Sequence, residues 1–367
     1  MYERLRRFLF RLDPERAHNM GSMAARAGQR LAHGMLEKRF RYESERLRTE
    51  VWGLSFANPL GIAAGFDKNA RLIRFWEALG CGFAEIGSVT AKKSRGNPKP
   101  RMFRLEEERA VINRMGLNNQ GAARIARRIA AGHPPAIPLA VSLTKTHDPA
   151  IQGQDAIKDF TTSFSACAPF SSLVVLNLSC PNTAEGRTFE DPNALDELLG
   201  YIMPLRLVME SPPPILLKLS PPVTDRVVLD SQVDEIVAVS RAHGIDGFVA
   251  SNTESGRDLI DVSEERLAAI GPGGLSGPPL RSRSTELVRY LYEKTGGKLP
   301  IIGVGGVSTG QDAYDKIRAG ASLVQLYTAL VYEGPAVFRL IKMELDELLE
   351  RDGFASVSDA VGVGPAN

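Results

Sequence analysis

Eight short apolar runs, each separated from the next by a segment of helical character, are the feature that most restricts how this chain can fold. Runs of this length and composition are typical of fully buried strands. They fall at 60–64, 84–87, 139–143, 173–178, 215–219, 247–251, 301–304 and 323–326. Eight strand–helix units predict an α/β protein with the TIM (β/α)8-barrel fold, whose active-site groups lie at the carboxyl ends of the strands. An open doubly wound sheet is the alternative, although it usually has fewer strands.

The segment before the first run predicts a two-helix extension. Apolar residues such as Leu5, Phe8 and Leu12 fall on one helical face, and most of the arginines fall on the other. Asp13 and Pro14 have the pattern of an N-cap and first residue of a second amphipathic helix. Both helices either pack on the barrel or form a monotopic membrane contact, with arginines near anionic head groups. We therefore divide the chain into an N-terminal helical segment at 1–45, a barrel at 46–352 and a C-terminal tail at 353–367.

The composition excludes several classes of protein. The formal net charge is only +2, so no strong field indicates a nucleic-acid partner. Three cysteines without C-x-x-C spacing predict a reducing compartment, with no disulfide framework and no metal site of the structural-zinc type. No apolar run approaches the ~20 residues of a membrane span. Arginines interrupt the N-terminal stretch where a signal peptide needs its apolar core.

Small, polar or charged residues follow all eight apolar runs. Packing gives little reason for such residues at the same end of every strand, so they predict an active site there. In chain order they are 64–68, 87–90, Ser142, Asn177 with Cys180 and Asn182, Lys218, 251–253, 303–306, and Tyr327 with Thr328.

The ends of the last two runs predict a phosphate site. Gly305 and Gly306 follow the seventh run, and Tyr327 and Thr328 follow the eighth, which is where barrels of this class hold a phosphate group. Because no G-x-G-x-x-G opens a helix after the first strand, a single phosphate favours FMN over a dinucleotide. Lys218 then has two interpretations: it places positive charge near the flavin N1–C2=O region, or it pairs with a buried carboxylate.

The turn at 177–182 contains the candidate reacting group. Asn177 and Asn182 each carry donors and an acceptor in one plane, which suits a ring with alternating C=O and N–H groups. The thiol of Cys180 between them titrates near pH ~8.5 when unperturbed and can exchange a proton with a substrate. A polar turn with a half-buried cysteine is the alternative. Lys68 and Asn113, the latter in a long loop predicted at 91–114, form a candidate carboxylate site.

The motifs together resemble those of the dihydroorotate dehydrogenases, and the resemblance covers nearly the whole chain. L-D-P-E-R-A-H at 12–18 and P-R-M-F-R-L at 100–105 are similar to the membrane-associated, quinone-using class 2 enzymes. The other motifs are A-G-F-D-K at 64–68, I-N-R-M-G-L-N-N at 112–119, N-L-S-C-P-N at 177–182, S-N-T at 251–253, G-G-L-S-G at 273–277, I-I-G-V-G-G-V at 301–307 and A-S-L-V-Q-L-Y-T at 321–328.

The resemblance implies roles for specific residues. Cys180 is the implied catalytic base, and Arg104 and Tyr327 are implied to border the path of the quinone. The implied FMN contacts are Ala64, Gly65, Lys68, Ser88, Ser142, Asn177, Lys218, Ser251, Gly277, Gly306, Tyr327 and Thr328. The implied dihydroorotate contacts are Lys68, Asn113, Arg114, Met115, Gly116, Leu117, Asn177, Asn182, Asn252 and Thr253.

The implied activity is the oxidation of (S)-dihydroorotate to orotate in pyrimidine biosynthesis, with FMN as hydride acceptor and a membrane quinone as final acceptor. The implied location is the cytoplasmic face of the cell membrane, as a peripheral protein, with the mitochondrial inner membrane as the alternative.

Four positions depart from the class 2 pattern. Cys180 stands where that class has Ser, Leu117 where it has Phe, Ser142 where it has Asn, and Pro278 where it has a basic residue. The first two match the soluble class 1 enzymes. One alternative is therefore a related FMN-dependent dihydroorotate or dihydropyrimidine dehydrogenase that uses fumarate or NAD. Another is a flavin-retaining membrane protein without turnover, which the intact catalytic set argues against.

Overall fold

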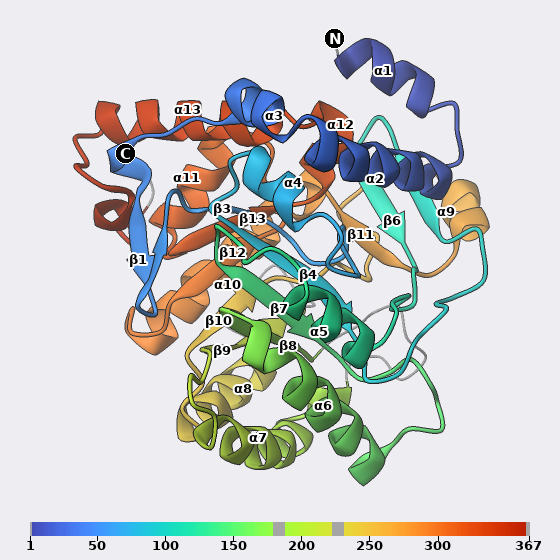
Figure 1. Cartoon of the computed structure of the whole chain (residues 1–367), viewed down its shortest axis with the longest axis vertical. Helices are drawn as coiled ribbons and strands as arrows, with labels where there is room; N and C mark the ends of the chain where they lie inside the picture. The colour runs from blue at the N-terminus through green and yellow to red at the C-terminus, as the bar shows by residue number, and fades with distance from the viewer. Residues whose placement is uncertain (1, 179–187, 222–230, 365–367) are drawn as a thin grey trace.

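A closed parallel barrel surrounded by helices forms the centre of the molecule (Figure 1). The computed structural model describes residues 2–178, 188–221 and 231–364. Its barrel strands are β3 (Leu60–Ile62), β4 (Phe83–Val89), β7 (Leu139–Leu143), β8 (Leu173–Asn177), β9 (Ile215–Leu219), β10 (Gly247–Ala250), β12 (Ile301–Val304) and β13 (Leu323–Leu326). They pair in the order β10-β12-β13-β3-β4-β7-β8-β9. The predicted TIM barrel is confirmed, and each of the eight apolar runs supplies one strand.

The helices between the strands cover the outside of the barrel and bury its outward-facing apolar side chains. They are α4 (Ile73–Ala78), α5 (Ala122–Ala130), α6 (Gly153–Cys167), α7 (Pro192–Leu207), α8 (Ser231–Ala242), α10 (Arg281–Thr295), α11 (Gly310–Arg318), α12 (Thr328–Glu333) and α13 (Val337–Arg351). Helix α9 (Glu264–Ile270) lies away from the barrel wall and packs through Ile270 against Ile112 and Leu275. Residues 353–364 continue onto α11, where the amides of Gly362 and Gly364 donate to the carbonyls of Ile317 and Arg318.

The N-terminal segment contains three helices: α1 (Tyr2–Leu9), α2 (Pro14–Leu31) and α3 (His33–Phe40). The predicted N-cap is confirmed, since the Asp13 carboxylate accepts from the Arg16 amide at 2.9 Å. The third helix differs from the two-helix extension that the apolar pattern predicts. Residues 33–40 form the third because they contain neither proline nor a strong turn signal. No helix in the described ranges is both long and apolar enough to cross a bilayer.

Two small antiparallel sheets close the ends of the barrel. At the amino end, β1 (Thr49–Val51) and β2 (Leu54–Phe56) form a hairpin whose Phe56 packs edge-on against Phe83, with ring centroids 5.8 Å apart. At the carboxyl end, β5 (Met102–Leu105), β6 (Ala110–Asn113) and β11 (Gly274–Ser276) form a three-stranded sheet. The expectation of a plain loop at 91–114 was therefore wrong for residues 102–105 and 110–113. Their apolar positions pack against β11, which the local sequence does not reveal.

Candidate active site

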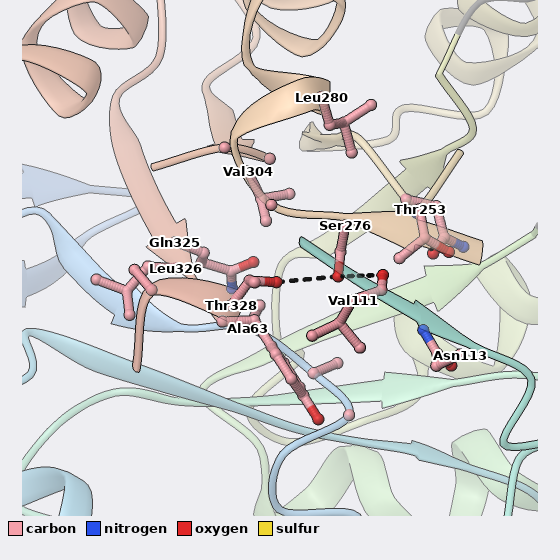
Figure 2. A pocket seen from close by; sticks show the side chains of 18 of the residues that line it. Ala63, Val111, Asn113, Thr253, Ser276, Leu280, Val304, Gln325, Leu326 and Thr328 are labelled. Carbon is pink, nitrogen blue, oxygen red and sulfur yellow. Dashed lines mark hydrogen bonds between the residues drawn. The ribbon is translucent and has the colours of Figure 1, made fainter. Parts of the chain in front are cut away.

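A cavity of about 170 Å³ opens at the carboxyl ends of the barrel strands, as expected from the polar residues that follow them. Figure 2 shows that its walls come from the barrel, from β6 and from β11. We call this hollow the barrel-end cavity. Of the predicted site residues, those that line it are Ala64, Gly65, Lys68, Ser88, Asn113, Met115, Gly116, Leu117, Asn177, Lys218, Ser251, Asn252, Thr253, Gly277, Gly306, Tyr327 and Thr328.

The side chain of Asn177 is fixed at both of its polar atoms. Its Nδ2 donates to Ser88 Oγ at 2.9 Å, and its Oδ1 accepts from Asn252 Nδ2 at 3.1 Å. Ser88 Oγ lies in turn 2.9 Å from Ser142 Oγ. Because these residues come from strand ends or the turns after them, the barrel itself holds the two carboxamides in place. A fixed pair of amides can recognise the C=O and N–H edge of a flat ring.

Lys218 has a buried carboxylate beside it. Its Nζ lies 3.7 Å from Glu85 Oε1, and the two side chains are 7% and 0% exposed. Gln325 Nε2 donates to the other carboxylate oxygen at 2.7 Å. The pairing of Lys218 with a buried carboxylate is confirmed, and Lys218 also lines the cavity, while its placement beside a flavin stays a prediction. Glu85 Oε1 and Gln325 Oε1 are buried without a hydrogen-bond partner among the described residues.

Lys68 extends from the turn after β3, and its Nζ donates to the carbonyl of Gly65. Burial, together with the positive charge of Arg101, lowers the pKa of Lys68 to about 8. Arg101 is held by Glu15 of α2 through two hydrogen bonds, of 3.1 and 2.8 Å. Burial and the charge of Lys68 also lower the pKa of His18 to about 3, so this α2 side chain is neutral near pH 7. Helix α2 thus contributes to the electrostatics of the cavity.

Glycines form a cradle on the side of the cavity near β12. The φ angles of Gly305 and Gly306 are +119° and +74°, values that side chains rarely adopt. A Cβ on Gly306 would lie 2.6 Å from Arg281 Cα, so no other residue fits. Opposite them, Thr328 Oγ1 donates to Ser276 Oγ at 2.9 Å, and Ser276 Oγ donates to the carbonyl of Val111 at 3.2 Å (Figure 2). Bare backbone and hydroxyl groups of this kind suit a phosphate group.

The side of the cavity that faces the N-terminal helices is apolar. Met102, Val111, Met115 and Tyr332 form one buried cluster, and Phe10 packs against it with its ring 5.3 Å from that of Tyr332. An ion pair between Arg109 and Glu333 lies at this side of the cavity. The cavity therefore has a polar half over the barrel and an apolar half that leads toward α1.

Some predicted site residues lie elsewhere. Ser142 is buried behind Ser88 and does not line the cavity. The Arg114 guanidinium donates to the carbonyls of Ile270 and Pro272 after α9 and stacks on a ring of the β5 strand. Arg104 lies over the Phe10 ring, 4.5 Å from its centroid. Cys180 and Asn182 lie outside the described residues.

Sequence reasoning missed several residues of the cavity. Glu85 and Gln325 were overlooked, although a charged residue inside the apolar strand β4 was a usable signal. Met102 and Val111 carried no signal, because they reach the cavity only through the sheet over the barrel end, and Tyr332 carried none because it reaches the cavity from α12.

The fold and the cavity define a TIM-barrel protein with a phosphate-type cradle and an amide-lined pocket. The family model for dihydroorotate dehydrogenase matches residues 46–349, and the chain belongs to that family. A dihydroorotate dehydrogenase (quinone) from Halobacterium salinarum is 44% identical over 363 residues, covering 99% of each chain. One of the same name from Cereibacter sphaeroides is 43% identical, covering 98% of this chain and 96% of that relative. The crystal structure of ligand-free DHODH from Eimeria tenella is 34% identical, with a TM-score of 0.84 over 96% of this chain and 99% of that one.

Proposed function

We propose that this protein oxidises dihydroorotate to orotate and passes the electrons to a quinone. The observation that carries the proposal is the fixed amide pair of Asn177 and Asn252 in one cavity with Lys68. Dihydroorotate combines a carboxylate with a ring of C=O and N–H groups, so a lysine and two carboxamides match its chemistry. The names of the relatives, which match over nearly the full length, support the same substrate and acceptor.

FMN fits the rest of the barrel-end cavity. The Gly305–Gly306 backbone, Gly277 and the Thr328 hydroxyl suit its phosphate, while Lys218 suits the negative charge of a reduced flavin ring. When bound, FMN supplies the two-electron acceptor for the substrate and the electron donor for the quinone.

The protein's own residues bind the substrate and move its proton. Lys68 and Asn113 hold the carboxylate, and Asn177 and Asn252 hold the ring and stabilise charge that develops on it. We assign removal of the C5 proton to the Cys180 thiol, which its place in the 177–182 motif supports. The carbonyl next to C5 makes that proton acidic enough for a thiolate to accept.

The apolar half of the cavity supports a quinone as the acceptor. Met102 and Tyr332 line the cavity, and Phe10, the residue after α1, packs against their cluster. On the outer surface of the same helices, Leu5 and Phe8 are 51% and 55% exposed, and Met23 of α2 is 60% exposed. Exposed apolar side chains on amphipathic helices fit a peripheral contact with the membrane in which a quinone dissolves.

An acceptor assay tests the proposal. The purified protein should release FMN on denaturation and should oxidise dihydroorotate when a ubiquinone or menaquinone analogue is supplied. Fumarate and NAD should give no turnover. Turnover with fumarate or NAD alone would identify a soluble-acceptor enzyme, and failure to oxidise dihydroorotate with any acceptor would refute the activity.

A further inference from the structure

A second cavity, of about 410 Å³, lies outside the barrel between α2, the start of α4 and the end of α5. Arginines supply five of its eleven lining residues, and His133 adds a sixth basic group. None of its lining residues is acidic, and none lines the barrel-end cavity. We call it the arginine cavity and define it by Arg26, Arg30, Arg71, Arg74 and Arg128.

Within the described ranges, none of these five arginines forms an ion pair with a carboxylate. Arg128 donates instead to two neutral oxygens, Asn69 O at 2.5 Å and Gln120 Oε1 at 2.6 Å. Its pKa is lowered by burial and by the neighbouring positive charges, Arg71 first among them. Asp67 is the acid that interacts electrostatically with Arg128. Its carboxylate accepts hydrogen bonds from the backbone amides of Arg71 and Leu72. The neighbouring positive charges therefore oppose the charge of Arg128, and no lining residue of the cavity supplies a negative charge.

Hydrogen bonds hold the walls of the cavity in position. Gln29 of α2 spans to the α4 segment, where its Nε2 donates to Arg71 O at 2.8 Å and its Oε1 accepts from the Phe75 amide at 3.1 Å. These two bonds hold the arginines of α2 against those of the α4 segment. A like-charged cluster that is held together in this way can be stabilised by an anion.

We propose that the arginine cavity binds a phosphate-bearing anion. Guanidinium groups match phosphate oxygens in geometry and charge, and several in one cavity favour a phosphate ester over a single carboxylate. A phospholipid head group and a free phosphate ester share this chemistry. Helix α2, which supplies Arg26 and Arg30, also exposes the apolar Met23 and Leu31. When α2 lies on a membrane, its apolar side chains contact the lipid and its arginines lie near the phosphate groups of the lipid.

Paired double variants of the full-length, flavin-loaded protein test the proposal. The double variant Arg26→Gln/Arg74→Gln removes two cations of the cavity. Among the described residues, neither arginine donates a side-chain hydrogen bond. Arg16→Gln/Arg39→Gln removes the same charge from exposed positions of α2 and α3, away from the cavity. The readouts are sedimentation with phosphatidylcholine vesicles, with and without phosphatidylglycerol, and the melting temperature with and without glycerol phosphate.

The parent and the control pair should prefer the phosphatidylglycerol vesicles, or melt at a higher temperature with glycerol phosphate, and the cavity pair should lose that response. At about 1 kcal/mol per cation near an anionic surface, the loss of vesicle binding is roughly tenfold to thirtyfold. Loss of the vesicle response alone assigns the cavity to lipid head groups, and loss of the glycerol phosphate response alone assigns it to free phosphate esters. Equal responses of the two pairs, or no response of the parent to either probe, would overturn the proposal. Neither readout requires dihydroorotate oxidation.

Discussion

The barrel-end cavity and the arginine cavity differ in the negative charge that the chain places beside their cations. In the barrel-end cavity, Lys218 lies 3.7 Å from the buried Glu85, and the amide of Asn177 is fixed at both polar atoms. In the arginine cavity, five guanidinium groups line a hollow without a lining acid. The chain itself supplies the partners of the polar groups in the first cavity, whereas the second gathers cations with no acid among its lining residues. Polar groups that are already in position can stabilise charge that develops during a reaction. A cluster of like charges attracts an anion of the opposite sign.

The largest effect is expected at the base. Cys180→Ala should slow flavin reduction by dihydroorotate by roughly 10²–10⁴-fold, the usual contribution of a positioned base. Cys180→Ser should retain partial activity, with its pH profile displaced to higher pH because a hydroxyl loses its proton less readily than a thiol. Stopped-flow bleaching against pH compares the three proteins. An alanine variant as fast as the parent would show that Cys180 is not the base.

Glu85→Gln sharpens the comparison by leaving Lys218 without its acid. Removing one partner of a buried ion pair costs about 3–5 kcal/mol, so chemical denaturation should show a large loss of stability. The flavin midpoint potential should become more positive, because an unopposed Lys218 favours the negatively charged reduced ring. Glu333→Gln, which breaks the half-exposed pair with Arg109, is the matched control and should cost at most about 1 kcal/mol. Equal losses of stability for the two variants would contradict the expectation that the buried ion pair matters more than the half-exposed one.

A variant of α1 tests whether the N-terminal helices contact the membrane. Leu5→Ser with Phe8→Ser removes two exposed apolar side chains of α1 without touching the Glu15–Arg101 pair of α2. Vesicle binding should weaken by roughly tenfold or more, given the apolar area that the two side chains could bury in lipid. Flavin reduction by dihydroorotate should not change, because neither residue lines the barrel-end cavity. Unchanged vesicle binding would make α1 an ordinary packing element.

The pH dependence of orotate binding tests Lys68. Its pKa of about 8 means that the side chain is protonated below pH 8 and neutral above it. Only the protonated form attracts a carboxylate, so affinity should be constant at lower pH and should fall by about tenfold per pH unit above pH 8. Lys68→Arg should move this fall to higher pH, since a guanidinium keeps its proton. Spectral titration with orotate measures both, and a flat profile to pH 10 in the parent would contradict this role of Lys68.

Periodicity in the sequence predicted the barrel well, because each of its strands is buried on both faces and reads as an uninterrupted apolar run. The strand β9, with the pattern Ile-Leu-Leu-Lys-Leu, shows this, and its lysine marks the point where the strand meets the cavity. The roles implied for Cys180 and Asn182 stay predictions, since these residues lie outside the described ranges.

The features that the sequence did not predict depend on contacts between distant segments. Strand β5 pairs with β6, and β6 pairs with β11, which lies more than 150 residues later, so the sheet that these strands complete is not evident from the local pattern at 102–113. The arginine cavity collects side chains from α2, α4, α5 and the segment before α4, each of which has an ordinary charge pattern when taken alone. Glu85 was detectable as a charge in a buried strand, but its partner Lys218 comes from a strand that is not its neighbour in the barrel.

The most direct test of the account is a single turnover without oxygen. Dihydroorotate is mixed with the purified, flavin-loaded protein, the flavin absorbance is followed, and a quinone analogue is then added. The account predicts that the flavin bleaches with one orotate formed per flavin, and that the quinone restores the oxidised spectrum. A flavin that stays oxidised in the presence of dihydroorotate, in a protein that a chemical reductant can bleach, would contradict it.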